Sequence, residues 1–366
     1  MNTSRKIKVN LGTFDLAKGI GILLVIFSHM QLNYPINEVA LLGPVYIILS
    51  FVGSGLMPMF FMISGYGFKA KSSSKMLKKT FSESFGALFI SFFVYVALVP
   101  LAYYPVMSSN PSVWIDYSVR KTLSWLLGLP TPTNIMGIDV FPIGAMWFLM
   151  ALFWTQNIMN QIAKIKSIIL QIIVVLLSVV IGMILLKMNI TIYCLPQGLI
   201  SVFFFYIGYV LKKYSILEKN LYKLWPYAIT LPISILHFCI VGQKGELAFA
   251  LASGRFTAFD FIASTVCGVF LVFLGVLCGQ CTWKSLEWMK EIGVHTYWIM
   301  CIHSIEYMGM PWYELAHEKT NSYLWIGIEV FIKTILISIG CMAVKKISQQ
   351  RYMKKRMKQS EKLQCN

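Results

Sequence analysis

Three ionisable side chains occur within one apolar segment near the start of the chain, FDLAKGIGILLVIFSHM. Asp15 and Lys18 stand near its beginning, and His29 follows Lys18 by eleven residues. In a helix this spacing predicts that the three side chains share one stripe, with Lys18 and His29 about 16 Å apart. Lysine binds phosphate oxygens as a point charge, and histidine transfers protons or groups near neutral pH. The stripe is therefore typical of an anion site at one end and of acid–base or nucleophilic chemistry at the other.

Each of these residues also has an ordinary explanation. Lys18 can extend to the membrane interface with Asp15 as its i,i+3 partner. His29 can be an interfacial histidine that is hydrogen-bonded to a neighbouring helix. Gly19 and Gly21 leave room beside the stripe for close approach of either a helix or a ligand. The residues by themselves leave these alternatives open.

A second group of ionisable residues lies in the last two apolar segments. His303 is expected at a depth similar to that of His29, with Glu306 one turn further along the same face. His303 is therefore a second catalytic candidate, and interhelical hydrogen bonding is the alternative. Glu329 and Lys333 are spaced i,i+4, which favours a structural ion pair inside a span.

Composition identifies the solvent of this chain as lipid. Its 366 residues are 57% hydrophobic and only 13% charged, and the mean hydropathy is +0.68. A net charge of +17 would suggest nucleic acid in a soluble protein, but here the cations gather between apolar segments, so no nucleic-acid partner is predicted. The eight cysteines are scattered and indicate neither a disulfide framework nor a metal site.

Apolar windows of about 20 residues predict an all-α, polytopic transmembrane helical bundle of about ten helices. The windows lie near residues 14–32, 45–68, 84–106, 142–163, 167–187, 191–211, 224–242, 257–281, 292–311 and 323–344. Lys and Arg concentrate in alternate connections, which predicts that the N- and C-termini are cytoplasmic.

Two further regions follow from this arrangement. Residues 1–345 are predicted to form a single transmembrane domain, and residues 346–366 a basic cytoplasmic tail that can contact membrane lipids. The longest connection, 107–141, is predicted on the outer side. There Asp139, together with Glu314, His317 and Glu318 of a later loop, are candidates for binding acceptor hydroxyls, and Trp147 and Trp312 for stacking on sugar rings; exposed loop charges and aromatic belts are the alternatives.

Several segments resemble one known family. KGIGILLVIFSH at residues 18–29 resembles the first-helix motif of the acyltransferase-3 family of bacterial membrane O-acyltransferases, a basic residue followed after ten residues by histidine. Lys18 stands where most members carry arginine, which resembles the branch related to fucose 4-O-acetylases. FFMISGYGF, MWFLMALF, LPQGLISVFFFYIGYVLKK and GVHTYWIMCIHS are similar to further family stretches, so the resemblance covers nearly the whole chain. KMLKKTFSESF departs from the family pattern of arginines and a proline after the second helix.

The resemblance implies an enzyme of the bacterial plasma membrane. Family members move an acyl group, usually acetyl from cytoplasmic acetyl-CoA, onto a hydroxyl of a cell-envelope glycan or lipid-linked sugar. Acyl-CoA is then a donor substrate, and no permanently bound cofactor is expected. The alternatives are a transporter or flippase of a glycan or lipid intermediate, and a membrane scaffold.

The resemblance also implies roles for individual residues. His29 and His303 are the expected catalytic residues, and His29 either deprotonates the acceptor hydroxyl or carries the acyl group. The donor is expected to contact a group of polar residues, with its thioester arm along the glycine-lined face of the first helix. This group is Lys18, Asp15, Ser64, Lys78 and Lys79.

Overall fold

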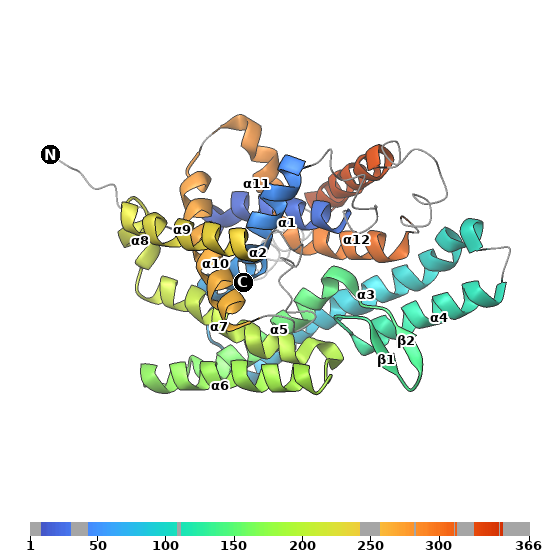
Figure 1. Cartoon of the computed structure of the whole chain (residues 1–366), viewed down its shortest axis with the longest axis horizontal. Helices are drawn as coiled ribbons and strands as arrows, with labels where there is room; N and C mark the ends of the chain where they lie inside the picture. Colours follow the sequence, from blue (N-terminus) through green and yellow to red (C-terminus); the bar gives the residue numbers. More distant parts are fainter. Residues whose placement is uncertain are drawn as a thin grey trace, which may run out of the picture.

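The protein is an all-helical bundle with one small hairpin. The computed structural model describes residues 9–30, 43–107, 111–241, 257–281, 283–310, 312, 326–343 and 345–346. Within these residues there are 13 helices, six of them long and apolar enough to cross a membrane (Figure 1). The predicted polytopic helical bundle is confirmed, and its orientation across the membrane stays a prediction.

The elements follow the predicted windows in order. The first half contains η1 (Leu11–Phe14), α1 (Asp15–Met30), α2 (Gly43–Tyr66), α3 (Ser73–Met107), α4 (Pro111–Leu127), β1 (Thr133–Ile135), β2 (Ile138–Val140) and η4 (Gly144–Met146). The second half contains α5 (Trp147–Ile162), α6 (Ile168–Lys187), η5 (Ile192–Cys194), α7 (Leu195–Lys213), α8 (Ile216–Asn220), α9 (Leu224–Val241), α10 (Ala258–Gly279), η7 (Lys284–Leu286), α11 (Glu287–Val294) and α12 (Thr296–Gly309). A last helix occupies Ile326–Ala343.

The centre of the bundle is built from α1 and α2. α2 packs between α7 and α10, whereas α1 packs against α10, α11 and α12. Phe14, Phe61 and Phe204 are fully buried there. By contrast, α6 is apolar on nearly all sides and exposes Ile169 and Leu177 at one edge of the bundle (Figure 1). This is the pattern of a lipid-facing helix around a close-packed interior.

The third helix starts earlier than predicted. α3 begins at Ser73 rather than near residue 84, so Lys78 and Lys79 lie on a helix and not in a loop. Its first turns are polar on one side. These polar residues lower the mean hydropathy, and the apolar window therefore began later. The other side carries Met76 and Thr80, which are buried, and Asn157 of α5 donates a hydrogen bond of 2.8 Å to the Thr80 hydroxyl. Packing of this buried side against α5 explains why the exposed lysines between Met76 and Thr80 are also helical.

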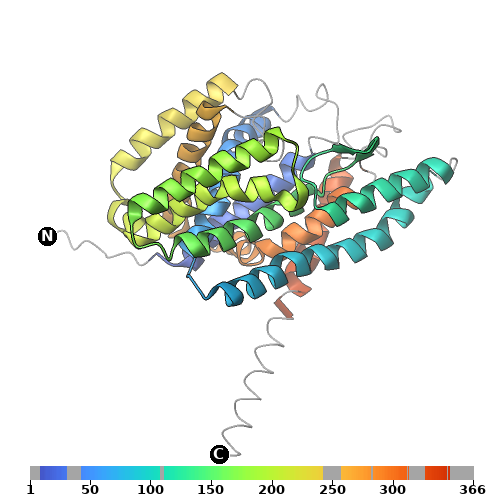
Figure 2. The same ribbon diagram turned by 90° about the horizontal axis from the view of Figure 1, so that it is seen from below.

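The connection 107–141 contains a helix and a hairpin that were not predicted. α4 runs beside α3, and the two extend together beyond the other helices (Figures 1 and 2). Trp125 of α4 is buried beside Tyr95 of α3, whereas Ile115 and Val119 are exposed. Three charged residues lower the mean hydropathy of α4, and this is why the sequence pattern did not reveal it.

The window 292–311 also divides into two helices. α11 ends and α12 begins at His295, whose backbone (φ −103°, ψ 11°) leaves the helical region. On α11, Glu291 accepts a hydrogen bond of 2.7 Å from Lys345, and this contact lowers the pKa of the Glu291 carboxyl. The ion pair ties the end of the predicted domain 1–345 to α11. Apart from Lys346, the predicted tail 346–366 lies outside the described residues.

Candidate functional site

The two candidate histidines meet between α1 and α12. His29 Nδ1 lies 3.0 Å from His303 Nε2, and the two rings stack with centroids 5.2 Å apart. His303 is buried, whereas His29, in the last turn of α1, is partly exposed. The structure therefore joins two residues that are separated by more than 270 positions in the chain, and it leaves one of them accessible.

A carboxylate lies behind the histidine pair. Glu306 Oε2 is 3.4 Å from His303 Nδ1, and the two residues are three positions apart on α12. Glu306 itself is only 6% exposed. A buried carboxylate requires compensating donors, because an unpaired charge inside a membrane bundle is very unfavourable.

Lys333 and Trp312 supply these donors. Lys333 Nζ donates to both oxygens of Glu306 at 2.8 Å and also lies 3.1 Å from Glu329 Oε1. The indole N–H of Trp312 donates to Glu306 as well. The i,i+4 pair of Glu329 and Lys333 predicted from sequence is therefore present. Its lysine, however, also belongs to the histidine cluster, which spacing along one helix could not reveal.

The hydrogen-bond partners define which imidazole nitrogen is free. A carboxylate only accepts, so the contact with Glu306 requires a proton on His303 Nδ1. In the neutral ring, His303 Nε2 is then the acceptor, and His29 Nδ1 must donate to it. The lone pair of neutral His29 is consequently on Nε2, the nitrogen directed away from His303. The arrangement prepares this atom to accept a proton or to attack an electrophile.

At the other end of the stripe, Lys18 and Asp15 form the expected i,i+3 pair. The Lys18 Nζ to Asp15 Oδ1 distance is 2.6 Å, and both side chains are about one fifth exposed, at 22% and 18%. Within the part of the chain that the structure describes, Lys18 is the only cation that forms an ion pair with Asp15. Asp15 therefore orients Lys18, and Lys18 keeps some contact with solvent.

The glycines of α1 allow close packing with α11 and α2. A Cβ added to Gly19 would lie 1.9 Å from the Met289 carbonyl oxygen, and one added to Gly293 would lie 1.7 Å from that of Asp15. A Cβ on Gly21 would meet the Phe60 ring at 2.9 Å. Because α11 fills the space beside Gly19, the thioester arm cannot run along the whole of this face as expected, and Gly21 borders a small apolar pocket.

The other expected donor-binding residues lie on α2 and α3. Ser64 is partly buried, and its hydroxyl donates within its own helix to the Phe60 carbonyl at 2.9 Å. Lys78 and Lys79 are exposed on the first turns of α3, and Lys79 lies 3.6 Å from Glu83. An exposed pair of this kind contributes little to stability, so both lysines remain available to an anion.

A cavity of about 590 Å³ opens between α3, α5 and α12. Its lining includes Glu83 of α3, Gln156 of α5, and Tyr297 and Trp298 of α12. Because Lys79 pairs with Glu83, the cavity lies next to the basic first turns of α3. Trp298 precedes His303 by five residues, or about 8 Å along the helix axis. The cavity thus joins a basic surface to the helix that carries His303.

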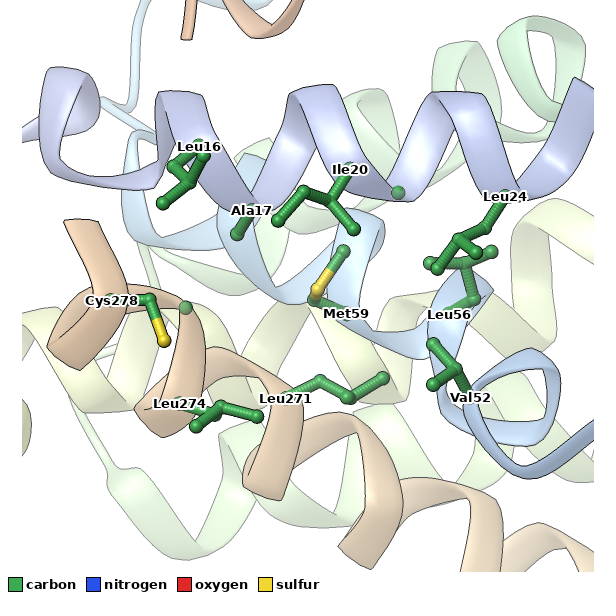
Figure 3. A pocket seen from close by; sticks show the side chains of 12 residues that line it. Leu16, Ala17, Ile20, Leu24, Val52, Leu56, Met59, Leu271, Leu274 and Cys278 are labelled. Carbon is green, nitrogen blue, oxygen red and sulfur yellow. The ribbon is translucent and has the colours of Figure 1, made fainter. Parts of the chain in front are cut away.

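A second pocket, of about 110 Å³, has a different character (Figure 3). It lies between α1, α2 and α10, and apolar side chains such as Ile20, Leu56 and Leu271 line it. On α1, lining residues such as Leu16 and Ile20 are on the side opposite to Lys18 and His29. With neither a charged group nor access to the histidines, this pocket does not fit the transfer reaction.

The outer-face candidates differ in how they are placed. Asp139 is exposed in the hairpin and accepts a hydrogen bond from Asn134 at 2.7 Å. Trp147 is partly buried at the start of α5. Trp312 is only 3% exposed and bound to Glu306, so its expected role in stacking on a sugar is wrong. Glu314, His317 and Glu318 lie outside the described residues.

Comparison with known proteins adds one match. A family model described as an acyltransferase domain matches residues 11–343, a region that includes both histidines, Glu306 and Lys333. No curated protein and no solved structure matches the chain.

Proposed function

The chain belongs to the acyltransferase-3 family and is a multi-pass membrane acyltransferase; from this premise we propose the identity of its donor, its acceptor and its catalytic base. The donor is cytoplasmic acyl-CoA, first of all acetyl-CoA, and the acceptor is a hydroxyl of a cell-envelope glycan or lipid-linked sugar. We also propose that the enzyme works in a bacterial plasma membrane and that it is similar to the fucose 4-O-acetylase branch of the family.

The observation that carries this proposal is the chain of contacts from His29 through His303 to Glu306. His29 Nε2 removes the proton of the acceptor hydroxyl, and the oxygen attacks the thioester carbonyl carbon. When the C–S bond breaks, the CoA thiolate leaves and takes up the proton that His29 holds. His303 and Glu306 orient His29 and stabilise its protonated form, as the second and third members of a catalytic triad do.

The donor is proposed to occupy the cavity between α3, α5 and α12. In the predicted topology this cavity is on the cytoplasmic half of the bundle, beside Lys78 and Lys79, which attract the CoA phosphates. The arm of the donor then follows α12 toward His303. Lys18 lies on the cytoplasmic end of α1 and adds a further cation for phosphate.

Sealed membrane vesicles test the direction of transfer. Inside-out vesicles that contain the protein are expected to incorporate label from radioactive acetyl-CoA into the glycan or lipid fraction, whereas right-side-out vesicles require permeabilisation. Vesicles with the variant His29→Ala provide the control. Equal labelling by both sealed preparations would contradict a cytoplasmic donor. Translocation of a labelled lipid-linked sugar, without any acyl product, would instead identify a transporter.

The role of Lys18 is tested by removing and by retaining its charge. Lys18→Ala is expected to raise KM for acetyl-CoA about tenfold with little change in kcat, because one charge-assisted contact to phosphate is lost. Lys18→Arg retains the cation and the pairing with Asp15, and should stay close to wild type. Lys187→Ala, an exposed lysine at the end of α6, is the matched control. A similar loss in both Lys18 variants would argue against phosphate binding.

A further inference from the structure

An aromatic ring lies against both histidines. The Tyr307 ring stacks on that of His29 with centroids 4.8 Å apart and an interplanar angle of 30°, and it lies 5.8 Å from the ring of His303. Tyr307 follows His303 by one turn of α12 and is therefore on the same face of the helix. Neither the sequence motifs nor the transfer mechanism described above gives this residue a role.

The turn that carries Tyr307 is held by α4. Lys121 Nζ donates a hydrogen bond of 2.8 Å to the Met308 carbonyl oxygen, next to Tyr307 in the chain. That carbonyl is in the last turn of α12, where the helix offers no N–H partner and where a cation is favourable. Lys121 is 6% exposed and its ammonium lies 4.7 Å from the Tyr117 ring centroid. A buried cation of α4 thus binds the last turn of α12.

A second element packs against the same turn. Gly144 in η4 has a φ of +59°, and a Cβ added there would lie 2.9 Å from Met308 Cγ and 3.6 Å from Tyr307 Cδ1. Residues with a side chain rarely adopt this backbone conformation, and a side chain at this position would not fit the space. Glycine therefore allows η4 to approach α12 closely. Two independent contacts, through Lys121 and Gly144, therefore fix the place of Tyr307.

We propose that Tyr307 is a positioning residue for the transfer reaction: its ring, held by Lys121 and Gly144, fixes the plane of the His29 imidazole. Without the stacked ring, the His29 imidazole can rotate. Its Nδ1 then loses the hydrogen bond to His303, and its Nε2 no longer points toward the acceptor hydroxyl. This inference rests on the proposed function, in which His29 Nε2 is the base. It also assigns a role to α4, because Lys121 of α4 supports the turn of α12 that carries Tyr307.

Three substitutions separate the ring, its hydroxyl and its support. Tyr307→Phe keeps the stacked ring and should retain kcat within about threefold. Tyr307→Leu should lower kcat about 10- to 100-fold at an unchanged KM for acetyl-CoA, because displacement of a reacting group by about 1 Å has an effect of this size. Lys121→Met should lower kcat about tenfold. Arg120→Met, which removes the neighbouring cation that pairs with Asp116, is the matched control and should leave kcat unchanged.

A second readout does not depend on transfer. Diethyl pyrocarbonate modifies neutral imidazole, and the rate of modification at His29 can be followed by mass spectrometry in the folded, detergent-solubilised protein. Removal of the ring that covers His29 is expected to raise this rate several-fold in Tyr307→Leu but not in Tyr307→Phe. The thermal unfolding midpoint of each variant shows whether the fold is retained.

The outcomes distinguish the inference from the proposed function. If Tyr307→Leu transfers acyl groups like wild type, or if Tyr307→Phe loses as much activity as Tyr307→Leu, positioning by the ring is refuted while the transfer reaction stands. If wild type shows no transfer but His29 modification still depends on the ring, the proposed function fails and the positioning of His29 stands. An unchanged rate of His29 modification in Tyr307→Leu overturns the inference.

Discussion

Replacement of His29 by alanine is expected to abolish acyl transfer while the protein still folds. His29 supplies the Nε2 lone pair at the end of the hydrogen-bonded chain from Glu306, and loss of a general base lowers the rate by about 10² to 10⁴. Because His29 is partly exposed at the end of α1, its truncation leaves no buried polar group without a donor except at His303 Nε2. The expected change is therefore mainly in kcat.

The measurement is transfer of labelled acetyl from acetyl-CoA in membranes with equal amounts of folded protein. His303→Ala should lower the activity less than His29→Ala does. In this variant His29 remains, but it loses its hydrogen-bond acceptor and its orientation. His295→Ala alters a histidine at the junction of α11 and α12 and is the matched control. If His29→Ala retains the activity of wild type, the mechanism proposed here is wrong.

The second large effect is expected in the buried charge cluster. It contains two carboxylates, Glu306 and Glu329, and one ammonium, Lys333. Glu306→Gln leaves a neutral pair of Lys333 and Glu329, so the fold should persist. The amide can no longer stabilise a positive charge on the histidines, and kcat should fall by about 10² or more, as when the carboxylate of a catalytic triad is removed.

Lys333→Met should have the opposite profile. It leaves two carboxylates buried without their shared cation, and removal of one partner of a buried ion pair costs about 3–5 kcal/mol. A markedly lower thermal unfolding midpoint is therefore expected for Lys333→Met than for Glu306→Gln. Glu287→Gln breaks an exposed pair with Lys290 and is the control for both, with an expected change near zero. Equal unfolding midpoints for Lys333→Met and wild type would contradict this account of the cluster.

The candidate site extends over more of the chain than its motifs do. Glu306 and Lys333 come from different helices, and Trp312 lies between these helices in the sequence. The sequence shows that these three residues are polar or aromatic. Residue spacing, however, predicts contacts only between residues of the same helix. For this reason Glu329 was recognised as a partner of Lys333, whereas Glu306 was not.

Local periodicity and hydropathy determined a large part of this protein. The apolar windows predicted the helical membrane bundle, because a span of hydrocarbon needs about 20 apolar residues whatever their neighbours are. Spacing on one helix placed Lys18 and His29 on one stripe and predicted the pairs of Asp15 with Lys18 and of Glu329 with Lys333. These predictions depend only on the 3.6-residue period.

Only the tertiary structure decided what meets across helices. The contact of His29 with His303, the closure of Gly19 by α11 and the hold of Lys121 on α12 all depend on the relative shift and rotation of packed helices. The local sequence of a helix does not show which residues of other helices its side chains contact. In addition, a polar helix such as α4 becomes stable only by packing. The sequence alone therefore determined that His29 is a candidate base, and the packing of α12 decided which of its nitrogens is free to act.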